Sequence, residues 1–270
     1  MEEVLLYERV GKVGKVILNR PKVRNALNRE LVEGLGPAMR QADEDPQTNV
    51  IVLCAAGDKA FTAGFDLKES ISSPIVNVPE RRTNTLMELN NWRTIWEAKK
   101  PVVASVQGYC IGGGVWMTLM CDMIIASEDA KFGEPELKYS YANDVLIEPW
   151  KMTMNKVKEL AFLGDFMSAQ ELHAAGVVNR VVPLEKLEEE TMKLANRLAE
   201  QPPEAIRMVK YEINKTYEMM GIRNAMDFAA EIFNLCRINQ VQEQSEFNKI
   251  VNEQGLKAAL AWKEAQEEKK

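Results

Sequence analysis

Two short apolar runs, each followed by a glycine-bearing turn, constrain the fold of this chain more than any other feature. Residues 49–54 (NVIVLC) precede a turn at residues 60–68 (AFTAGFDLK), and residues 101–106 (PVVASV) precede a turn at residues 108–114 (GYCIGGG). Unbroken apolar runs of this length are typical of strands buried on both faces. We therefore expect both turns at the ends of adjacent buried strands, where each can direct a backbone N–H at the same carbonyl oxygen.

The remaining elements predict a repeated α/β unit followed by a helical region. Further strands are expected at residues 13–19, 121–127 and 177–183, and helices at 28–42, at 80–99 and from about Gly113. Strand, turn, helix and strand recur at about 45 to 50 residues, which indicates stacked ββα units. From residue 187 the pattern predicts helices only, at residues 187–200, 203–219, 222–241 and 244–263. We place a domain boundary near residue 190, with a core at 1–190, a helical lobe for assembly and partial cover of the site at 191–270, and a frayed end at 267–270.

Charge and hydropathy exclude several classes of partner. The 270 residues include 34 Lys and Arg against 40 Asp and Glu, which gives a net charge of −6, and basic residues do not interleave with aromatic ones. This argues against nucleic-acid binding. We expect no membrane span, because eighteen apolar residues never follow one another. The start lacks the pattern of a secretory signal, so we expect a cytoplasmic protein.

The nucleophile, metal and phosphate motifs of other enzymes are missing. The single histidine, His173, is expected near the end of a helix that Gly176 closes. The four cysteines have no Cys-x-x-Cys spacing, and we expect them to be reduced thiols. No Gly-x-Ser-x-Gly elbow, Walker loop or dinucleotide fingerprint is present, and nothing calls for a metal. Two amide donors in a dry site stabilise negative charge on a thioester oxygen, so the paired turns point to thioester chemistry.

A series of motifs in fixed order then gives a family resemblance. The segments are residues 19–27 (NRPKVRNAL), 59–69 (KAFTAGFDLKE), 100–114 (KPVVASVQGYCIGGG), 121–122 (CD), 131–136 (KFGEPE), 163–165 (LGD), 168–170 (SAQ) and 175–178 (AGVV). This series resembles the crotonase, or enoyl-CoA hydratase/isomerase, superfamily over most of residues 4 to 190. The resemblance implies a crotonase-type spiral of ββα units with a C-terminal α-helical trimerisation lobe, and a coenzyme A (CoA) thioester as substrate.

The resemblance also implies roles for residues of the two turns and of the segment after the first strand. The backbone N–H groups of Phe65 and Gly113 would form the oxyanion hole. The nucleotide and the pantetheine would be contacted by Arg24, Ala26, Ala63, Asp66 and Lys68. No cofactor is expected beyond the coenzyme A that the substrate carries.

The carboxylates bear on the reaction type. Hydratases of this family hold a water between two glutamates, and Trp116 occupies the first of these positions, where an indole cannot transfer a proton. Trp116 is therefore expected to form a wall of the acyl pocket. Glu136 occupies the second position, and a single carboxylate is sufficient to move a proton between carbons, as an enoyl-CoA isomerase does.

Asp144 leaves a second route open. Ungapped counting from Glu136 aligns it with the additional acid of dienoyl-CoA isomerases and with the nucleophile of 4-chlorobenzoyl-CoA dehalogenase, which makes a hydrolase or dehalogenase the alternative enzyme. A CoA-binding relative without catalysis is the alternative outside enzymes. Glu134 and Glu148 are acidic neighbours with weaker claims. Aromatic residues that would suit a flat acyl group are Phe65, Trp116, Tyr139, Tyr141 and Trp150.

The resemblance finally implies assembly through the helical region. Members of the family form trimers, often paired into hexamers, so we expect a homotrimer or a dimer of trimers. A residue of the last helices is expected to approach the coenzyme A of a neighbouring subunit. The candidates by location are Phe233, Trp262 and Lys263.

Overall fold

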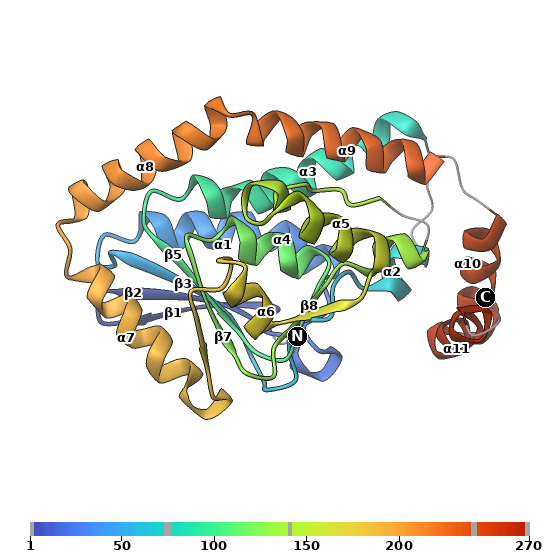
Figure 1. Cartoon of the computed structure of the whole chain (residues 1–270), viewed down its shortest axis with the longest axis horizontal. Helices are drawn as coiled ribbons and strands as arrows, with labels where there is room; N and C mark the ends of the chain where they lie inside the picture. Colours follow the sequence, from blue (N-terminus) through green and yellow to red (C-terminus); the bar gives the residue numbers. More distant parts are fainter. Residues whose placement is uncertain (1–2, 73–76, 140–141, 239–241, 268–270) are drawn as a thin grey trace.

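A six-stranded sheet lies at the centre of the molecule (Figure 1). The computed structural model describes residues 3–72, 77–139, 142–238 and 242–267. The strand order is β1-β2-β3-β5-β7-β10, in which β1 pairs antiparallel with β2 and the other neighbours are parallel. The strands are β1 (Leu5–Val10), β2 (Val13–Leu18), β3 (Val50–Ala55), β5 (Val102–Val106), β7 (Met123–Ser127) and β10 (Arg180–Val182).

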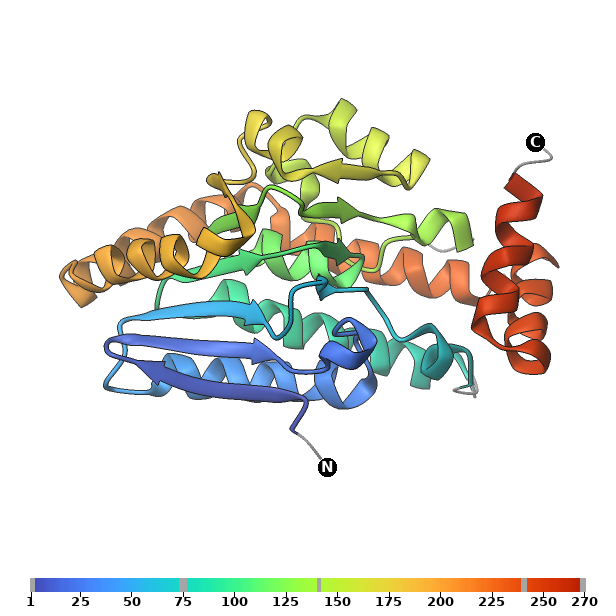
Figure 2. The ribbon, with the colours of Figure 1, turned by 90° about the horizontal axis from the view of Figure 1, so that it is seen from below.

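A second sheet of short strands continues from the first. Its order is β4-β6-β8-β9, and β4 follows β3, β6 follows β5 and β8 follows β7 along the chain, so each long central strand is succeeded by a short one. This arrangement is the predicted spiral of ββα units (Figure 2). The short strands are β4 (Ala60–Thr62), β6 (Tyr109–Ile111), β8 (Lys131–Gly133) and β9 (Phe166–Ser168).

Helices cover both faces of the central sheet. The large core lies on the face of α1, α3 and α4, while α7 covers the opposite face. The helices are α1 (Arg29–Glu44), α2 (Leu67–Ser72), α3 (Val78–Glu97), α4 (Gly113–Met120), α5 (Met154–Leu163), α6 (Ala169–Ala174), α7 (Leu187–Ala199), α8 (Pro203–Met219), α9 (Ile222–Ile238), α10 (Gln242–Gln254) and α11 (Leu256–Glu267). Short 3-10 turns are η1 (Pro21–Val23), η2 (Pro135–Tyr139), η3 (Glu148–Trp150) and η4 (Leu184–Lys186).

Burial on both faces explains the unbroken apolar runs. In β3, Ile51 and Leu53 pack into the large core, whereas Val50 and Val52 pack against α7. Successive side chains of a strand point to opposite faces, so a strand covered on both sides needs apolar residues at every position. The two strands that precede the glycine turns are adjacent, as predicted, because β3 pairs with β5.

Several predicted boundaries agree with the structure. Asn28 caps α1 by accepting a hydrogen bond from the backbone N–H of Leu31, and His173 lies in the last turn of α6, just before Gly176. The boundary proposed near residue 190 falls inside α7, whose side chains Leu187 and Leu194 pack on the central sheet. The division into two domains therefore stays a prediction.

One predicted helix is wrong and several strands were missed. A single helix over residues 244–263 is replaced by α10 and α11, because Gly255 adopts a left-handed conformation with φ of +87°. The strands β1, β4, β6, β8 and β9 were not predicted; four of them have only three residues, too few for a period to be recognised. Residues 239–241, which the prediction gave to the helix now described as α9, and 268–270 lie outside the described residues.

Candidate functional site

The two glycine turns meet at one place. Strand β4 pairs with β6, so the segments that follow these strands run side by side. Gly64 has φ of +81°, and a Cβ added to it would lie 3.1 Å from the carbonyl oxygen of Ile111. Only glycine allows both this conformation and this close approach of backbone to backbone. The two turns therefore contact each other across the sheet.

At this contact, two backbone N–H groups point away from the hydrogen bonds that join the neighbouring segments. The bridge between Leu27 and Phe65 uses the carbonyl of Gly64 and the N–H of Asp66, which leaves the N–H of Phe65 on the opposite side of the strand. Gly113 is the first residue of α4, where N–H groups have no acceptor within the helix. The positive end of the helix dipole adds to this donor.

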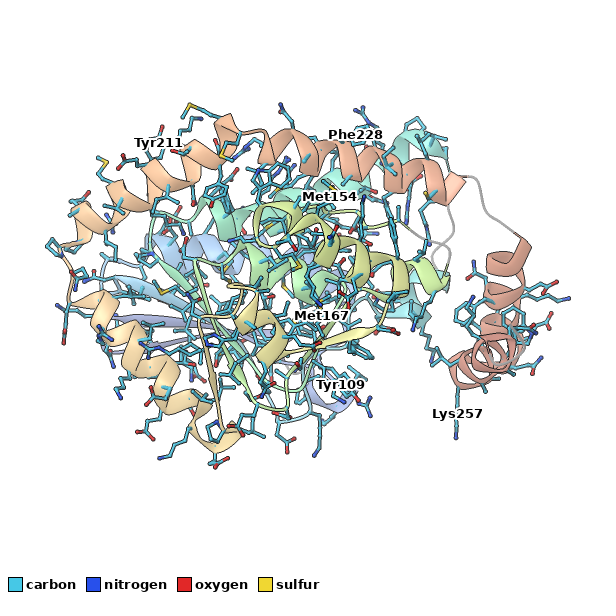
Figure 3. All side chains as sticks on the ribbon, viewed as in Figure 1. Tyr109, Met154, Met167, Tyr211, Phe228 and Lys257 are labelled. Carbon is cyan, nitrogen blue, oxygen red and sulfur yellow. The ribbon has the colours of Figure 1, made fainter. Side chains whose placement is uncertain are left out.

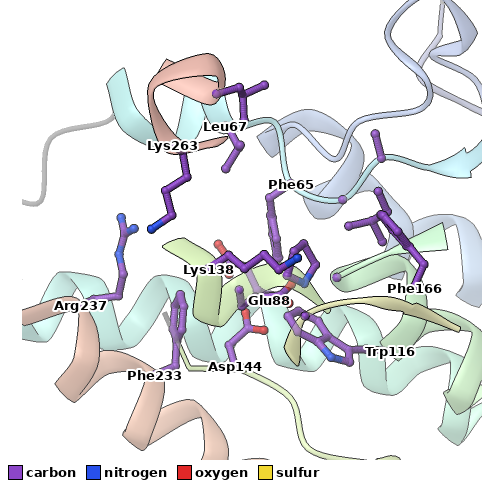
Figure 4. A pocket seen from close by; sticks show the side chains of 18 of the residues that line it. Phe65, Leu67, Glu88, Trp116, Lys138, Asp144, Phe166, Phe233, Arg237 and Lys263 are labelled. Carbon is purple, nitrogen blue, oxygen red and sulfur yellow. The ribbon is translucent and has the colours of Figure 1, made fainter. Parts of the chain in front are cut away.

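Both turns line one cavity of about 430 Å³ between the short strands, α3, α9 and α11 (Figure 4). Its wall combines apolar and charged side chains from many parts of the chain. The lining residues used below are Ala63, Phe65, Arg81, Glu88, Gly112, Trp116, Glu136, Lys138, Asp144, Phe233, Arg237 and Lys263. Figure 4 shows Asp144 and Glu88 between Trp116 on one side and Phe233 and Arg237 on the other.

Glu136 lies in this cavity beside the second glycine turn. It belongs to η2, and a methyl group added to Gly112, which has φ of +52°, would overlap its Oε1 atom and displace the carboxyl group. Its Oε2 atom is buried and has no hydrogen-bond partner among the described residues. Burial, together with the charge of the nearby Glu148, raises the pKa of Glu136 to about 7. A carboxyl group with this pKa can both take up and release a proton near neutral pH.

Asp144 faces the same cavity. Its side chain is 2% exposed, and its Oδ1 atom is buried without a hydrogen-bond partner in the described part of the chain. Burial, Glu88 and Glu136 all raise the pKa of Asp144 well above its usual range. The structure thus brings Glu136 and Asp144 together, and it adds Glu88 of α3, whose pKa is also raised by burial.

Trp116 lines the cavity and is held from behind by a buried carboxyl cluster. Its indole Nε1 donates to Oε1 of Glu134 at 3.1 Å, and the side-chain amide of Asn143 donates to Oε2 of Glu134 at 2.6 Å. Glu148 is also fully buried, and its carboxyl group acts electrostatically on Glu134. Burial and this neighbour raise the pKa of Glu134 well above its usual range. Glu134 thereby fixes both Trp116 and the residue before Asp144.

The segment expected to contact coenzyme A lies against the first glycine turn. The backbone N–H of Ala63 donates to the carbonyl of Arg24 at 2.9 Å, and Arg20 bridges the carbonyl of Ala26 and the carboxylate of Asp66. Arg24 is exposed, and so is Lys68 in α2. The structure therefore groups Arg24, Ala26, Ala63 and Asp66, with Lys68 two residues beyond Asp66.

Asn25 organises this segment and was missed. It is fully buried, with φ of +53°, and its side-chain amide donates to the carbonyls of Ala56 and Ala60 at 2.9 and 3.0 Å. Its Oδ1 accepts from the backbone N–H of Arg20. The signal was present, because asparagine is the non-glycine residue that best tolerates a left-handed conformation.

The other aromatic candidates have different outcomes. Trp150 was expected near the acyl group, and this is wrong, because it lines a second cavity beside Trp96 and Tyr217. Tyr139 ends η2, and nothing further is described of its side chain, while Tyr141 lies outside the described residues. Among the C-terminal candidates, Phe233 and Lys263 line the first cavity, whereas Trp262 packs between α10 and α11.

The spiral of ββα units and the shared cavity at its two glycine turns define a protein of the crotonase fold. A family model described as enoyl-CoA hydratase/isomerase matches residues 8–253. The chain belongs to this family of enzymes.

Individual relatives match the sequence of this chain over most of its length. The "Probable enoyl-CoA hydratase, mitochondrial" of Dictyostelium discoideum is 37% identical over 224 residues, which are 80% of this chain and 78% of that protein. The "Crotonyl-CoA hydratase" of Syntrophomonas wolfei is 30% identical over 245 residues, 90% of this chain and 93% of that protein. A solved enoyl-CoA hydratase/isomerase from Xanthobacter autotrophicus Py2 superposes with a TM-score of 0.94 at 32% identity, covering 97% of this chain and 98% of that one.

The described ranges contain neither a membrane-spanning helix nor a metal-binding cluster. No helix there has the length and apolar character needed to cross a bilayer. No group of three His, Cys, Asp or Glu side chains there is arranged to hold a metal ion. The metal-free chemistry and the cytoplasmic location stay predictions.

Proposed function

We propose that this protein is an acyl-CoA enzyme of the enoyl-CoA hydratase/isomerase type that works through a thioester enolate. The observation that carries the proposal is the position of Glu136, whose unpaired Oε2 shares one cavity with the two glycine turns. The N–H groups of Phe65 and Gly113 bind the thioester oxygen. Because they are fixed by the bridge to Leu27 and by the start of α4, they need no reorganisation as charge develops.

Glu136 is the proton carrier in this proposal. Its carboxylate takes a proton from the carbon next to the thioester, and the electron pair moves onto the carbonyl oxygen, where the two amides stabilise it. In a double-bond shift, the same carboxyl group returns the proton to a more distant carbon. In hydration, the oxygen of a water adds to the far carbon of the double bond while Glu136 takes a proton from that water, and Asp144 donates a proton to the carbon next to the thioester. Trp116 supplies an apolar wall in place of a carboxylate.

Asp144 suits the role of a proton donor better than that of a nucleophile. Burial raises its pKa well above the usual range and so favours the protonated form, and a protonated carboxyl group attacks carbon poorly. The hydrolase or dehalogenase alternative therefore has less support than the hydratase/isomerase reaction. It remains a distinct outcome of the experiment below.

The coenzyme A would lie along the segment of Arg24, Ala26, Ala63 and Asp66, with Lys68 near a phosphate. The exposed side chains of Arg24 and Lys68 support this placement, because phosphates need cations at the solvent boundary. The substrate brings the only coenzyme. We further propose a homotrimer or a dimer of trimers built through α8 and α9, which expose large apolar residues: Met208, Val209, Tyr211, Ile213, Met219, Phe228 and Leu235.

The test is turnover of defined thioesters by the purified protein and two variants. Crotonyl-CoA, a 3-enoyl-CoA, a cyclic dienoyl-CoA and an aryl-CoA are incubated and analysed by chromatography. We expect turnover of an enoyl-CoA, and a loss of about 10²- to 10⁴-fold in Glu136→Gln, because general acid–base catalysis contributes that much. Glu185→Gln on the exposed surface is the control.

Other outcomes would redirect the assignment. If all four thioesters stay unchanged while coenzyme A binds, the protein is a CoA-binding relative. If an ester on Asp144 is trapped by mass spectrometry and Asp144→Asn abolishes turnover, the covalent route replaces the enolate route.

A further inference from the structure

The end of the cavity away from Trp116 is lined by basic side chains of three helices. Arg81 comes from α3, Arg237 from α9 and Lys263 from α11. Figure 4 shows Arg237 and Lys263 on the side opposite Trp116, with Phe233 between Arg237 and Asp144. An alkyl chain would gain nothing from such a wall. The reaction proposed above does not use these groups.

Arg81 is held in place, yet its Nε atom has no acceptor among the described residues. Its guanidinium carbon lies 5.4 Å from the centre of the Phe233 ring, which fixes the group by a cation–π contact. Its Nε atom is buried and donates to no acceptor among the described residues. A buried donor without an acceptor is costly, so a ligand that supplies oxygen atoms there is favoured. The next residue, Arg82, differs from Arg81 because it forms an exposed ion pair with Glu231.

Burial favours the uncharged form of two acidic neighbours of Arg81, although the charge of Arg81 acts on them in the opposite direction. Glu88 and Asp144 line the same cavity, and burial raises the pKa of both, so at neutral pH they carry protons more readily than free carboxyl groups do. Lys138 is paired with Asp165 at 3.2 Å. The Oδ1 atom of Asp144, buried and unpaired, also points to a polar ligand. A protonated carboxyl group can donate a hydrogen bond to a ligand oxygen, whereas a carboxylate would repel an anion.

We propose that the substrate is the CoA thioester of an unsaturated dicarboxylic acid, whose distal carboxylate binds Arg81 at this end of the cavity. The proposal rests on the acyl-CoA activity proposed above. The planar guanidinium presents paired N–H groups that match a carboxylate, and Phe233 keeps it in one orientation. Such a site discriminates strongly against an acyl chain of the same length that lacks the charge, because the buried polar groups then stay unpaired.

The phosphates of coenzyme A are the other possible source of an anion for Arg81. The two sources separate in a comparison of thioesters that share coenzyme A and differ only at the distal group. A matched pair is the mono-CoA thioester of an unsaturated dicarboxylic acid and the methyl ester of the same compound. The saturated forms of the pair allow binding to be measured by calorimetry without turnover.

The experiment measures kcat/KM for both members of the pair in the wild type, Arg81→Met, Arg81→Lys and the control Arg82→Met. In the wild type we expect a preference for the free carboxylate, and in Arg81→Met a fall of that preference by about tenfold to a hundredfold, as for the loss of a charged hydrogen bond. Arg81→Lys should keep part of the preference, and Arg82→Met all of it.

Three results would overturn the inference. They are a wild-type preference for the methyl ester, an equal loss for both compounds in Arg81→Met, and weaker binding of free coenzyme A in Arg81→Met, which would assign Arg81 to a phosphate. In each case turnover of either thioester would leave the proposed function standing. If neither compound is turned over, the saturated pair still tests the carboxylate site by binding alone.

Discussion

At the scale of single residues, Glu136 makes the activity depend on pH. Its pKa is raised to about 7, and it must be a carboxylate to take up the first proton. We expect kcat/KM to rise about tenfold per pH unit below that pKa and to level off above it. The pH profile of kcat/KM with the best substrate of the panel measures this limb.

The sign of the effect on stability is opposite. The folded state releases this proton at a higher pH than the unfolded chain, whose glutamates titrate near 4.5. The contribution of Glu136 to stability is therefore complete below pH 4.5 and is lost as pH rises through about 7. In the pH profile of kcat/KM, a limb centred near pH 4.5 would show that another group titrates. A limb that is unchanged in the residual activity of Glu136→Gln would show the same.

At the scale of elements, the turn before α4 combines backbone strain with contact to Glu136. Gly112 has φ of +52°, and Gly11, in the turn between β1 and β2, has φ of +59° with open space around its Cα. We expect Gly11→Ala and Gly112→Ala each to lose about 1 to 3 kcal/mol of unfolding free energy from the strained backbone. Chemical denaturation measures this loss.

Only Gly112→Ala should also affect catalysis. The added methyl group overlaps Oε1 of Glu136 and displaces the carboxyl group, so we expect kcat to fall by about 10²-fold, as for a small misplacement of a catalytic group. Gly11→Ala should keep wild-type kcat, because nothing lies near its Cα. Equal activity of the two variants would remove Glu136 from the reaction.

The elements also show how far the sequence determines the fold. The runs that form β3 and β5 and the cap at Asn28 were predictable, because burial on both faces and the capping hydrogen bond each depend on local residue types. The short strands β4, β6 and β8 were not, because each exists only through its partners in the second sheet. Gly255 was present in the sequence as a break, yet apolar spacing on both sides of it favoured one helix.

The residues of the site also divide into those that the sequence predicted and those that it did not. The glycine turns and Glu136 were predictable from motifs in fixed order, and the structure groups them around one cavity. Glu88 and Arg81 were not predicted as site residues, because both lie in a helix whose periodicity indicated only packing. Their role depends on α9 and α11, which come from far along the chain and line the same cavity. Trp150 was misplaced for the same reason, since its neighbours come from α3 and α8.

At the scale of the whole molecule, the outer faces of α8 and α9 predict association. Tyr211 and Phe228 are each 65% exposed and project outward from these helices (Figure 3). We expect the wild type to form trimers or hexamers and the double variant Tyr211→Glu, Phe228→Glu to sediment as a smaller species, because charges on an apolar interface oppose its burial. Analytical ultracentrifugation measures the mass.

A matched control is Leu184→Glu, an apolar position in η4, outside α8 and α9, that is 39% exposed. It should leave the mass unchanged. A monomeric wild type at micromolar concentration would contradict the proposed assembly, and so would a double variant that keeps the wild-type mass.

The cavity is lined by residues from Ala63 to Lys263, and this has a consequence for synthesis of the protein. A chain growing on the ribosome can complete both sheets well before its last helices have emerged. The wall to which α11 contributes is absent until then. A nascent chain therefore completes this cavity only after α11 has emerged, and from that moment a ligand bound in the cavity ties the earliest strands to these helices.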